Sequence, residues 1–110
     1  MASVKKVLGQ KATAAITTWS LYTVPASREA TVSSIVVCNR GSTATTFRVS
    51  VRIGGAGAAN DQYLYYDLPI AAYDTFIATI GITLATTDIL EVYAGNANLS
   101  FNAFGDEAVV

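Results

Sequence analysis

One stretch of ten residues decides the fold class of this chain: Glu29-Ala30-Thr31-Val32-Ser33-Ser34-Ile35-Val36-Val37-Cys38. Its side chains fall into two alternating sets, one containing Val32 and the other Val37, and a period of two is that of a β-strand. Residues 35–38 are apolar in both sets, which predicts a central strand covered on both faces. We expect Cys38 to be a small buried side chain within it.

Segments with the same alternation lie on both sides of this stretch. Pro25 ends the segment before it, and Pro69 is expected to end a later strand or to lie at a sheet edge, because proline lacks an N–H group. Gly81 interrupts another segment and predicts a break or bulge. We predict about eight short strands, over residues 4–9, 18–24, 29–38, 46–53, 63–68, 75–84, 89–94 and 99–104.

The connections between these segments contain the residues of tight turns. Residues 39–45 and 95–98 include Asn and Gly, which tolerate positive φ, and each is expected to join a β-hairpin. No alternation of strands with helices is visible, so a parallel sheet is disfavoured. The spacing predicts an all-β fold, an antiparallel β-sandwich of the jelly-roll or Ig-like kind. We predict an N-terminal arm over residues 1–17 and a single sandwich domain over residues 18–110.

The composition limits the classes of partner. Of 110 residues, 52% are hydrophobic and only 14% are charged, with a net charge of −1, whereas an ordinary domain carries about 25% charged residues. Much of the surface is therefore expected to be small and weakly charged, which suits coverage by another chain. No basic footprint for nucleic acid or anionic lipid is present. No apolar run approaches the ~18–20 residues of a membrane span, so we expect neither nucleic-acid nor membrane partners.

The residues of common catalytic sites are largely missing. The chain has no histidine and one cysteine, which excludes imidazole-based triads and the standard zinc sites within one chain. Asp61, Asp67 and Asp74 could meet at one end of the sandwich, but nothing in the sequence indicates a cleft between them. We therefore expect no enzymatic activity, no metal site and no cofactor.

Six side chains stand out as candidate interface residues. Tyrosine is enriched at protein interfaces and sugar sites because it combines contact area with a polar tip. Two arginines, four positions apart, lie on the polar face of one predicted strand. There they could bind acidic groups of a neighbouring subunit. The alternative to an interface role is that the tyrosines are ordinary half-buried strand residues and that the arginines are solvated surface charges. The candidates are Tyr63, Tyr65, Tyr66, Tyr73, Arg48 and Arg52.

Several short runs carry a resemblance to a known group of proteins. They are Leu21-Tyr22-Thr23-Val24-Pro25-Ala26, Val37-Cys38-Asn39-Arg40-Gly41, Tyr66-Asp67-Leu68-Pro69-Ile70, Thr87-Asp88-Ile89-Leu90-Glu91-Val92-Tyr93-Ala94 and Leu99-Ser100-Phe101-Asn102-Ala103-Phe104-Gly105. In combination these runs resemble short tailed-bacteriophage virion structural proteins. The resemblance covers most of residues 21–105, is least over residues 1–17, and implies a place in the particle without any catalytic or metal-binding residue.

These observations lead to one leading hypothesis and two alternatives. The chain is expected to be a non-catalytic bacteriophage virion structural protein, present in many copies or as a homo-oligomer and bound to other virion proteins. Within the virion we favour a capsid decoration (cement) protein that stabilises the major capsid lattice; the alternative is a tail, baseplate or fibre component. A carbohydrate-binding attachment module that uses Tyr63, Tyr65 and Tyr66 is the alternative of another class. We expect synthesis in the host cytoplasm, and we expect residues 1–17 to be able to join a neighbour's sheet.

Overall fold

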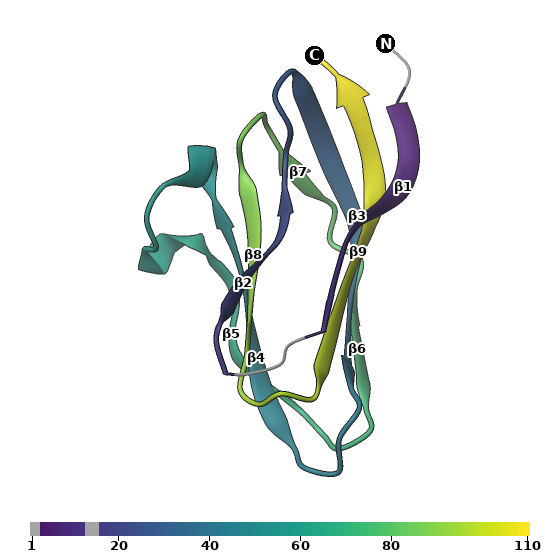
Figure 1. The fold of residues 1–110 in the computed structure, drawn as a ribbon, viewed down its shortest axis with the longest axis vertical. Helices are drawn as coiled ribbons and strands as arrows, with labels where there is room; N and C mark the ends of the chain where they lie inside the picture. Colours follow the sequence, from purple (N-terminus) through teal and green to yellow (C-terminus); the bar gives the residue numbers. More distant parts are fainter. Residues whose placement is uncertain (1–2, 13–15) are drawn as a thin grey trace.

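Two antiparallel β-sheets lie face to face in the computed structural model, which describes residues 3–12 and 16–110 (Figure 1). Two short 3₁₀ turns, η1 (Ile53–Gly55) and η2 (Asn60–Gln62), lie between the fourth and fifth strands. The strands in the described residues are β1 (Ser3–Ala12), β2 (Thr18–Thr23), β3 (Arg28–Asn39), β4 (Thr45–Arg52), β5 (Tyr63–Ile70), β6 (Thr75–Ala78), β7 (Ile82–Leu84), β8 (Ile89–Ala94) and β9 (Leu99–Val109).

The strand order identifies the sandwich as a jelly roll. Sheet A has the order β1-β9-β3-β6, with β7 also paired to β3, and sheet B has the order β2-β8-β4-β5. β6 pairs with residues 35–38 of β3 and β7 with residues 30–32, both on the side of β3 away from β9. Together they fill one strand position, so the two sheets have the four-by-four order of a jelly roll. The predicted antiparallel β-sandwich is confirmed, and the jelly-roll alternative is the one adopted.

The two predicted hairpins are wrong. Residues 39–45 connect β3 in sheet A to β4 in sheet B, and residues 95–98 connect β8 in sheet B to β9 in sheet A. The hydrogen-bonded partners of β4 are β5 and β8, and those of β9 are β1 and β3. Asn and Gly show where the chain reverses, but a reversal can equally well carry the chain about 10 Å across to the opposite sheet.

The predicted N-terminal arm contains a strand of the chain's own sheet. β1 covers the predicted strand at residues 4–9 and extends it to Ser3–Ala12, and it pairs with β9 along its length. This part of the predicted arm, residues 1–17, is therefore an edge strand in the structure, whereas residues 1–2 and 13–15 lie outside the described residues. The pairing joins the first strand to the last, which no local sequence pattern could indicate.

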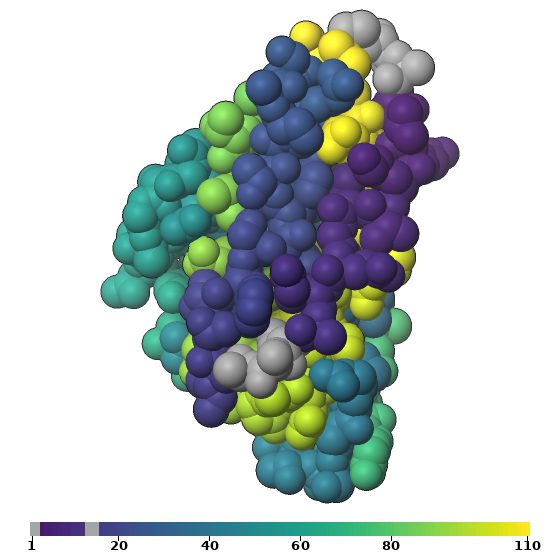
Figure 2. Space-filling model, in the orientation of Figure 1, coloured from purple at the N-terminus to yellow at the C-terminus, as the bar shows by residue number. Residues whose placement is uncertain are grey.

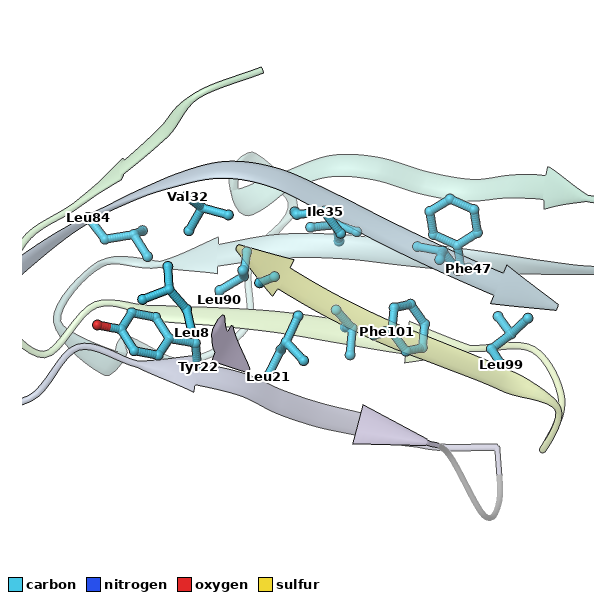
Figure 3. Packing of buried hydrophobic residues seen from close by; sticks show 14 of the residues in the cluster. Leu8, Leu21, Tyr22, Val32, Ile35, Phe47, Leu84, Leu90, Leu99 and Phe101 are labelled. Carbon is cyan, nitrogen blue, oxygen red and sulfur yellow. The ribbon is translucent and has the colours of Figure 1, made fainter. Parts of the chain in front are cut away.

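The core lies between the sheets and is mostly aliphatic, with two phenylalanines among its buried side chains (Figure 3). Phe47 from sheet B and Phe101 from sheet A are fully buried with ring centroids 6.3 Å apart. Full burial of such a side chain stabilises the fold by roughly 1.5–3 kcal/mol. In β3 the inward side chains are fully buried, but Cys38 on the outer face of sheet A is only half-buried, so that prediction is wrong in degree.

A polar contact also links the sheets near the N-terminal half of β1. The hydroxyl of Tyr22 in β2 donates a hydrogen bond of 2.5 Å to Glu107 Oε2 in β9. Glu107 Oε1 lies 3.7 Å from Lys6 Nζ and 3.8 Å from Arg28 Nε. Burial of the phenol, and then the hydrogen bond to Glu107, raise the pKa of Tyr22 well above its usual value. One carboxylate thus contacts side chains from β1, β2 and β3.

The strands of sheet A are interrupted at positions that lie side by side across the sheet. We call this line of interruptions the crease. The β1–β9 register shifts between Val7 and Gly9, and the β3–β9 register shifts between Val32 and Ser34. The first shift lies beside Ala103 and Phe104 of β9, and the second beside Phe104 and Gly105. The predicted break at Gly81, whose φ is +65°, falls between β6 and β7 at the same level. Bulges increase local twist and bend the bulged strand, so the aligned interruptions curve the sheet.

Candidate functional site: the outer face of sheet B

The register of β5 brings Tyr63, Tyr66 and Asp67 to the outer face of sheet B. Phe47 pairs with Leu68 and Val49 with Tyr65, so Arg48 of β4 faces two residues of β5, Tyr66 and Asp67. Asp67 has a φ of +50°, a conformation that Asp adopts more readily than most residues. The bulge turns Tyr66 and Asp67 toward the arginine that lies opposite them, as bulges near binding sites commonly do.

Arg48 is held by an acid and by two aromatic rings. Its Nε lies 2.6 Å and its Nη2 3.3 Å from the two carboxylate oxygens of Asp67, a bidentate pair. Its guanidinium lies 4.2 Å from the ring centroid of Tyr66 and 4.5 Å from that of Tyr93 in β8. The hydrogen bond to Asp67 raises the pKa of Arg48 further above its usual value, so the guanidinium stays charged. The ring of Tyr63 packs edge-on to Tyr66, with centroids 4.8 Å apart.

We name Arg48, Tyr63, Tyr66, Asp67 and Tyr93 the Arg48 cluster. Tyr66 is 58% exposed, so the cluster presents an aromatic ring to solvent while its charges are paired internally. Each contact with an exposed ring contributes about 0.5–1 kcal/mol and fixes the side chain in one rotamer. The cluster is therefore a preorganised surface of Tyr and Arg, the residue types most enriched at the centres of protein interfaces.

The second predicted arginine is also paired within the chain. Arg52 Nε lies 3.3 Å from Glu91 Oε2, across the β4–β8 pair. This nitrogen is buried and makes no hydrogen bond to any residue that the structure describes. Arg48 and Arg52 are therefore both paired with acids of the same chain. Whether they also bind acidic groups of a neighbouring subunit stays a prediction.

Four of the six predicted interface residues share this face and two do not. Arg48, Arg52, Tyr63 and Tyr66 lie on the outer face of sheet B. Tyr65 points the other way and is half-buried, with its ring 5.3 Å from Phe76 and 6.5 Å from Phe47. Tyr73 is 73% exposed in the turn after β5, where its N–H donates to the Gly41 carbonyl. The tyrosine run was thus divided between core and surface by the pleat of β5.

Sequence reasoning did not identify Tyr93 as a member of the cluster, and it did not predict that Asp67 binds Arg48. The alternation of β8 places Tyr93 on the polar side of its strand, but only the β4–β8 register sets it directly opposite Arg48. Asp67 was noted as a carboxylate that could meet Asp61 and Asp74. It binds Arg48 instead, while Asp74 Oδ1 accepts a hydrogen bond from the Thr75 N–H.

The described residues offer little for catalysis or metal binding. No group of three or more His, Cys, Asp or Glu side chains within residues 3–12 and 16–110 could hold a metal ion. The buried carboxylate of Asp88 accepts hydrogen bonds from the N–H groups of Gly54 and Ala85, which is a structural role. In the same part of the chain, no helix is both long and apolar enough to cross a membrane.

Comparisons with known proteins reveal a likeness in fold. No protein-family model matches the chain, and no curated protein matches it. A chain in the structure of the infectious bursal disease virus Gx strain matches with a TM-score of 0.55 at 15% identity, over 96% of this chain and 30% of that one. This chain therefore spans less than a third of that viral chain. The shared feature is the β-sandwich fold.

Two further structures match at lower scores. Both are of a pentameric capsid protein isolated from metagenomic phage sequences. Their TM-scores are 0.44 and 0.32 at 13% and 14% identity, over 98% of this chain and 60% and 68% of theirs.

Proposed function

We propose that this chain is a non-catalytic structural protein of a bacteriophage virion. The observation that carries the proposal is the jelly-roll strand order, in a fold that matches a virus structure over 96% of the chain. Jelly rolls are frequent in viral capsids, although lectins and other proteins also use them. The sequence runs that resemble tailed-phage virion proteins support the same assignment and favour a phage.

Within the virion we propose a capsid decoration role, in which the protein binds over the major capsid lattice. The Arg48 cluster supports this role because its aromatic and guanidinium groups are already ordered before any partner binds. Preorganised side chains lose less conformational entropy on association, so more of the contact energy appears as affinity. Since Arg48 and Arg52 are neutralised by Asp67 and Glu91, the partner surface needs aromatic, apolar and hydrogen-bonding groups rather than a strong charge.

The copy number in purified particles tests the role and distinguishes it from the tail alternative. We expect quantitative mass spectrometry of washed virions to find hundreds of copies per particle for a decoration protein, and about six or twelve for a tail or baseplate component, as the symmetry of each structure requires. Loss of the protein on washing would contradict both structural roles. A Tyr66→Ala variant that still occupies the particle fully would remove the Arg48 cluster from the contact.

A carbohydrate-binding role is the second candidate, and one observation favours it. Asn60, Tyr63 and Tyr66 border a surface hollow of about 370 Å³, next to η2. Against it, one ring face of Tyr66 is covered by Arg48, and Tyr65 packs on the core. A glycan array comparing the wild-type protein with the Tyr66→Ala variant tests this role. Specific binding that the variant loses would support it, and an absence of binding would exclude it for the glycans presented.

A further inference from the structure

The four sheet edges of the sandwich differ in how they are protected. The edge at β5 is interrupted by two register shifts and by Pro69, which has no N–H to donate. β6 and β7 are only four and three residues long. β2 is six residues long, and the backbone of its Leu21 lies against Gly9 in the second half of β1. Short strands, bulges, prolines and charged side chains, lysine above all, are the usual protections against edge-to-edge pairing.

Of these protections, the first half of β1 has only charged side chains, Lys5 and Lys6. Residues 3–7 keep an unbroken register with β9, and all five are exposed. Val4 is 62% and Val7 46% exposed, although valine in a strand is normally covered on at least one face. β1 forms a margin of the molecule, in dark purple at the upper right of the space-filling view (Figure 2). This half-strand is therefore a free edge that presents backbone groups and aliphatic side chains together.

The charges on this edge indicate the chemistry of a partner. Lys5 and Lys6 are adjacent, so their side chains leave opposite faces of the sheet. On the side of β1 that faces β9, each lysine has an acid near it: Lys5 is opposite Asp106 in the β1–β9 register, and Lys6 Nζ lies 3.7 Å from Glu107 Oε1. A strand added on the outer side of β1 meets the same two lysines, one on each face.

Pairing with a second copy of β1 is disfavoured by the same lysines. An antiparallel pair centred on residues 3–7 sets Lys5 directly opposite Lys5, and a shift of one position sets Lys5 opposite Lys6. Like charges directly opposite one another destabilise a strand pair. A partner with two consecutive acidic residues removes this repulsion and gives each lysine a carboxylate.

A hollow beside the edge offers room for a side chain of the added strand. Lys5, Val7, Thr31, Ser33 and Phe104 are among the residues that border it, on the outer face of sheet A at the crease, and its volume is about 500 Å³. Its lining at Val7 and Phe104 is apolar, so an aliphatic side chain that lies over β1 would be buried there.

We propose that residues 3–7 of β1 accept an extended segment of a partner protein as an additional strand of sheet A. The segment carries two consecutive acidic residues flanked by aliphatic ones. Backbone hydrogen bonds provide affinity in this mode of recognition, and alternate side chains provide specificity. The site is defined by its own chemistry and does not require the partner to be a virion protein, so it goes beyond the function proposed above.

The test uses the full chain and two synthetic peptides that differ only at their centre, Val-Glu-Glu-Val in one and Val-Lys-Lys-Val in the other. Titrations followed by backbone amide NMR shifts are expected to show binding of the acidic peptide at least about tenfold tighter than of the basic one, a difference of about 1.4 kcal/mol. Shifts are expected in residues 3–7 and in the neighbouring part of β9, with slower amide exchange in residues 3–7. Binding should weaken as salt is added.

A charge-reversal variant makes the test specific. The Lys5→Glu/Lys6→Glu variant is expected to reverse the preference and bind the basic peptide more tightly. Lys5→Glu alone keeps the Lys6–Glu107 contact and replaces the double variant if that one unfolds. Arg40→Glu, placed outside β1, is the control and should leave binding unchanged.

Three results of the peptide titrations would overturn the proposal. They are equal binding of both peptides, shifts confined to another surface, and no binding of the acidic peptide at millimolar concentration. Self-association that protects residues 3–7 in sedimentation and exchange measurements would also overturn it, because the occupant would then be a second copy. The copy number in virions is measured independently of peptide binding. A negative peptide titration therefore does not contradict the proposed virion role, and an unexpected copy number does not contradict the proposed strand addition.

Discussion

The outer face of sheet B and the free edge of sheet A satisfy their polar groups in opposite ways. On sheet B, Arg48 and Arg52 are paired with Asp67 and Glu91, and tyrosine rings hold Arg48 in place. On sheet A, residues 3–7 of β1 are exposed, and within residues 3–12 and 16–110 no strand pairs with their outer side. The first surface has its charges paired within the chain, and the second keeps backbone groups that an added strand can bind. Exposure alone therefore does not define a binding surface; the state of its polar groups determines which partner it can take.

The largest expected effect comes from filling the crease of sheet A. A Cβ at Gly105 would overlap the carbonyl oxygen of Thr31, and backbone atoms of two paired strands cannot easily move apart. Gly105→Ala is expected to lower the free energy of unfolding by about 3 kcal/mol, the upper end for overpacking. Urea denaturation measures this change. Gly57→Ala, where a Cβ meets nothing within 4 Å, is the matched control and should cost little. Similar stability of the two variants would show that the crease tolerates a side chain.

The next effect tests the contact that joins the two sheets below the free edge. Tyr22→Phe removes the hydrogen bond to Glu107 and is expected to lower the free energy of unfolding by about 2 kcal/mol at neutral pH, as for other hydrogen bonds to charged groups. The folded protein raises the pKa of Tyr22 above its ordinary value of 10.0. This contribution is therefore fully present below pH 10 and decreases as the pH rises further toward the raised value.

Denaturation curves between neutral pH and pH 11 check the prediction for Tyr22. The difference in stability between the wild-type protein and the Tyr22→Phe variant should shrink above pH 10. A constant difference across this range would mean that the hydroxyl does not titrate differently in the folded and unfolded states.

A smaller loss of stability is expected on sheet B. Arg48→Ala removes one exposed ion pair and two ring contacts, for a cost of about 1 kcal/mol after screening by solvent. The variant should weaken particle binding more than it weakens the fold. Thermal denaturation gives the first quantity and particle occupancy the second, with Arg40→Ala as the control arginine. If Arg48→Ala lowers the free energy of unfolding by several kcal/mol, the cluster stabilises the fold itself and is not only a contact surface.

The smallest effect on stability is expected for two exposed tyrosines. Tyr66→Ala removes the ring contact with Arg48 and should lower the free energy of unfolding by about 0.5–1 kcal/mol. Tyr73→Ala should change it by less than about 0.5 kcal/mol, as is usual for surface positions. Only Tyr66 belongs to the Arg48 cluster, so only its loss should reduce particle occupancy. An equal reduction by Tyr73→Ala would extend the contact surface to the turn after β5.

The sequence predicted the strands better than their partners. The strand around residues 29–38 and the break at Gly81 are local properties, and the structure confirms both. The predicted division of that strand into two faces is wrong, because the bulge between Val32 and Ser34 turns Val32 and Val37 to the same buried face. The hairpins across residues 39–45 and 95–98 were wrong because turn residues report the reversal and not the sheet that the chain enters. The tyrosines were chosen by residue type, which could not separate Tyr65 on the core from Tyr66 on the surface. Consecutive strand residues point to opposite faces, and only the packing of β5 decided which of the two faces the core. The register shift between Val49 and Ser50 then sets Tyr63 on the same face as Tyr66.

The sequence by itself determined that this chain is all-β, weakly charged and without histidine. Strand period is a property of each segment alone, and composition does not depend on contacts between segments. Only the tertiary structure decided that β1 pairs with β9, that the sandwich is a jelly roll, and that Arg48 meets Asp67 between two tyrosines. Each of these joins segments far apart in the chain. Pairing is selected by the packing of the whole core and by bulges at single residues, and neither leaves a mark in the local pattern.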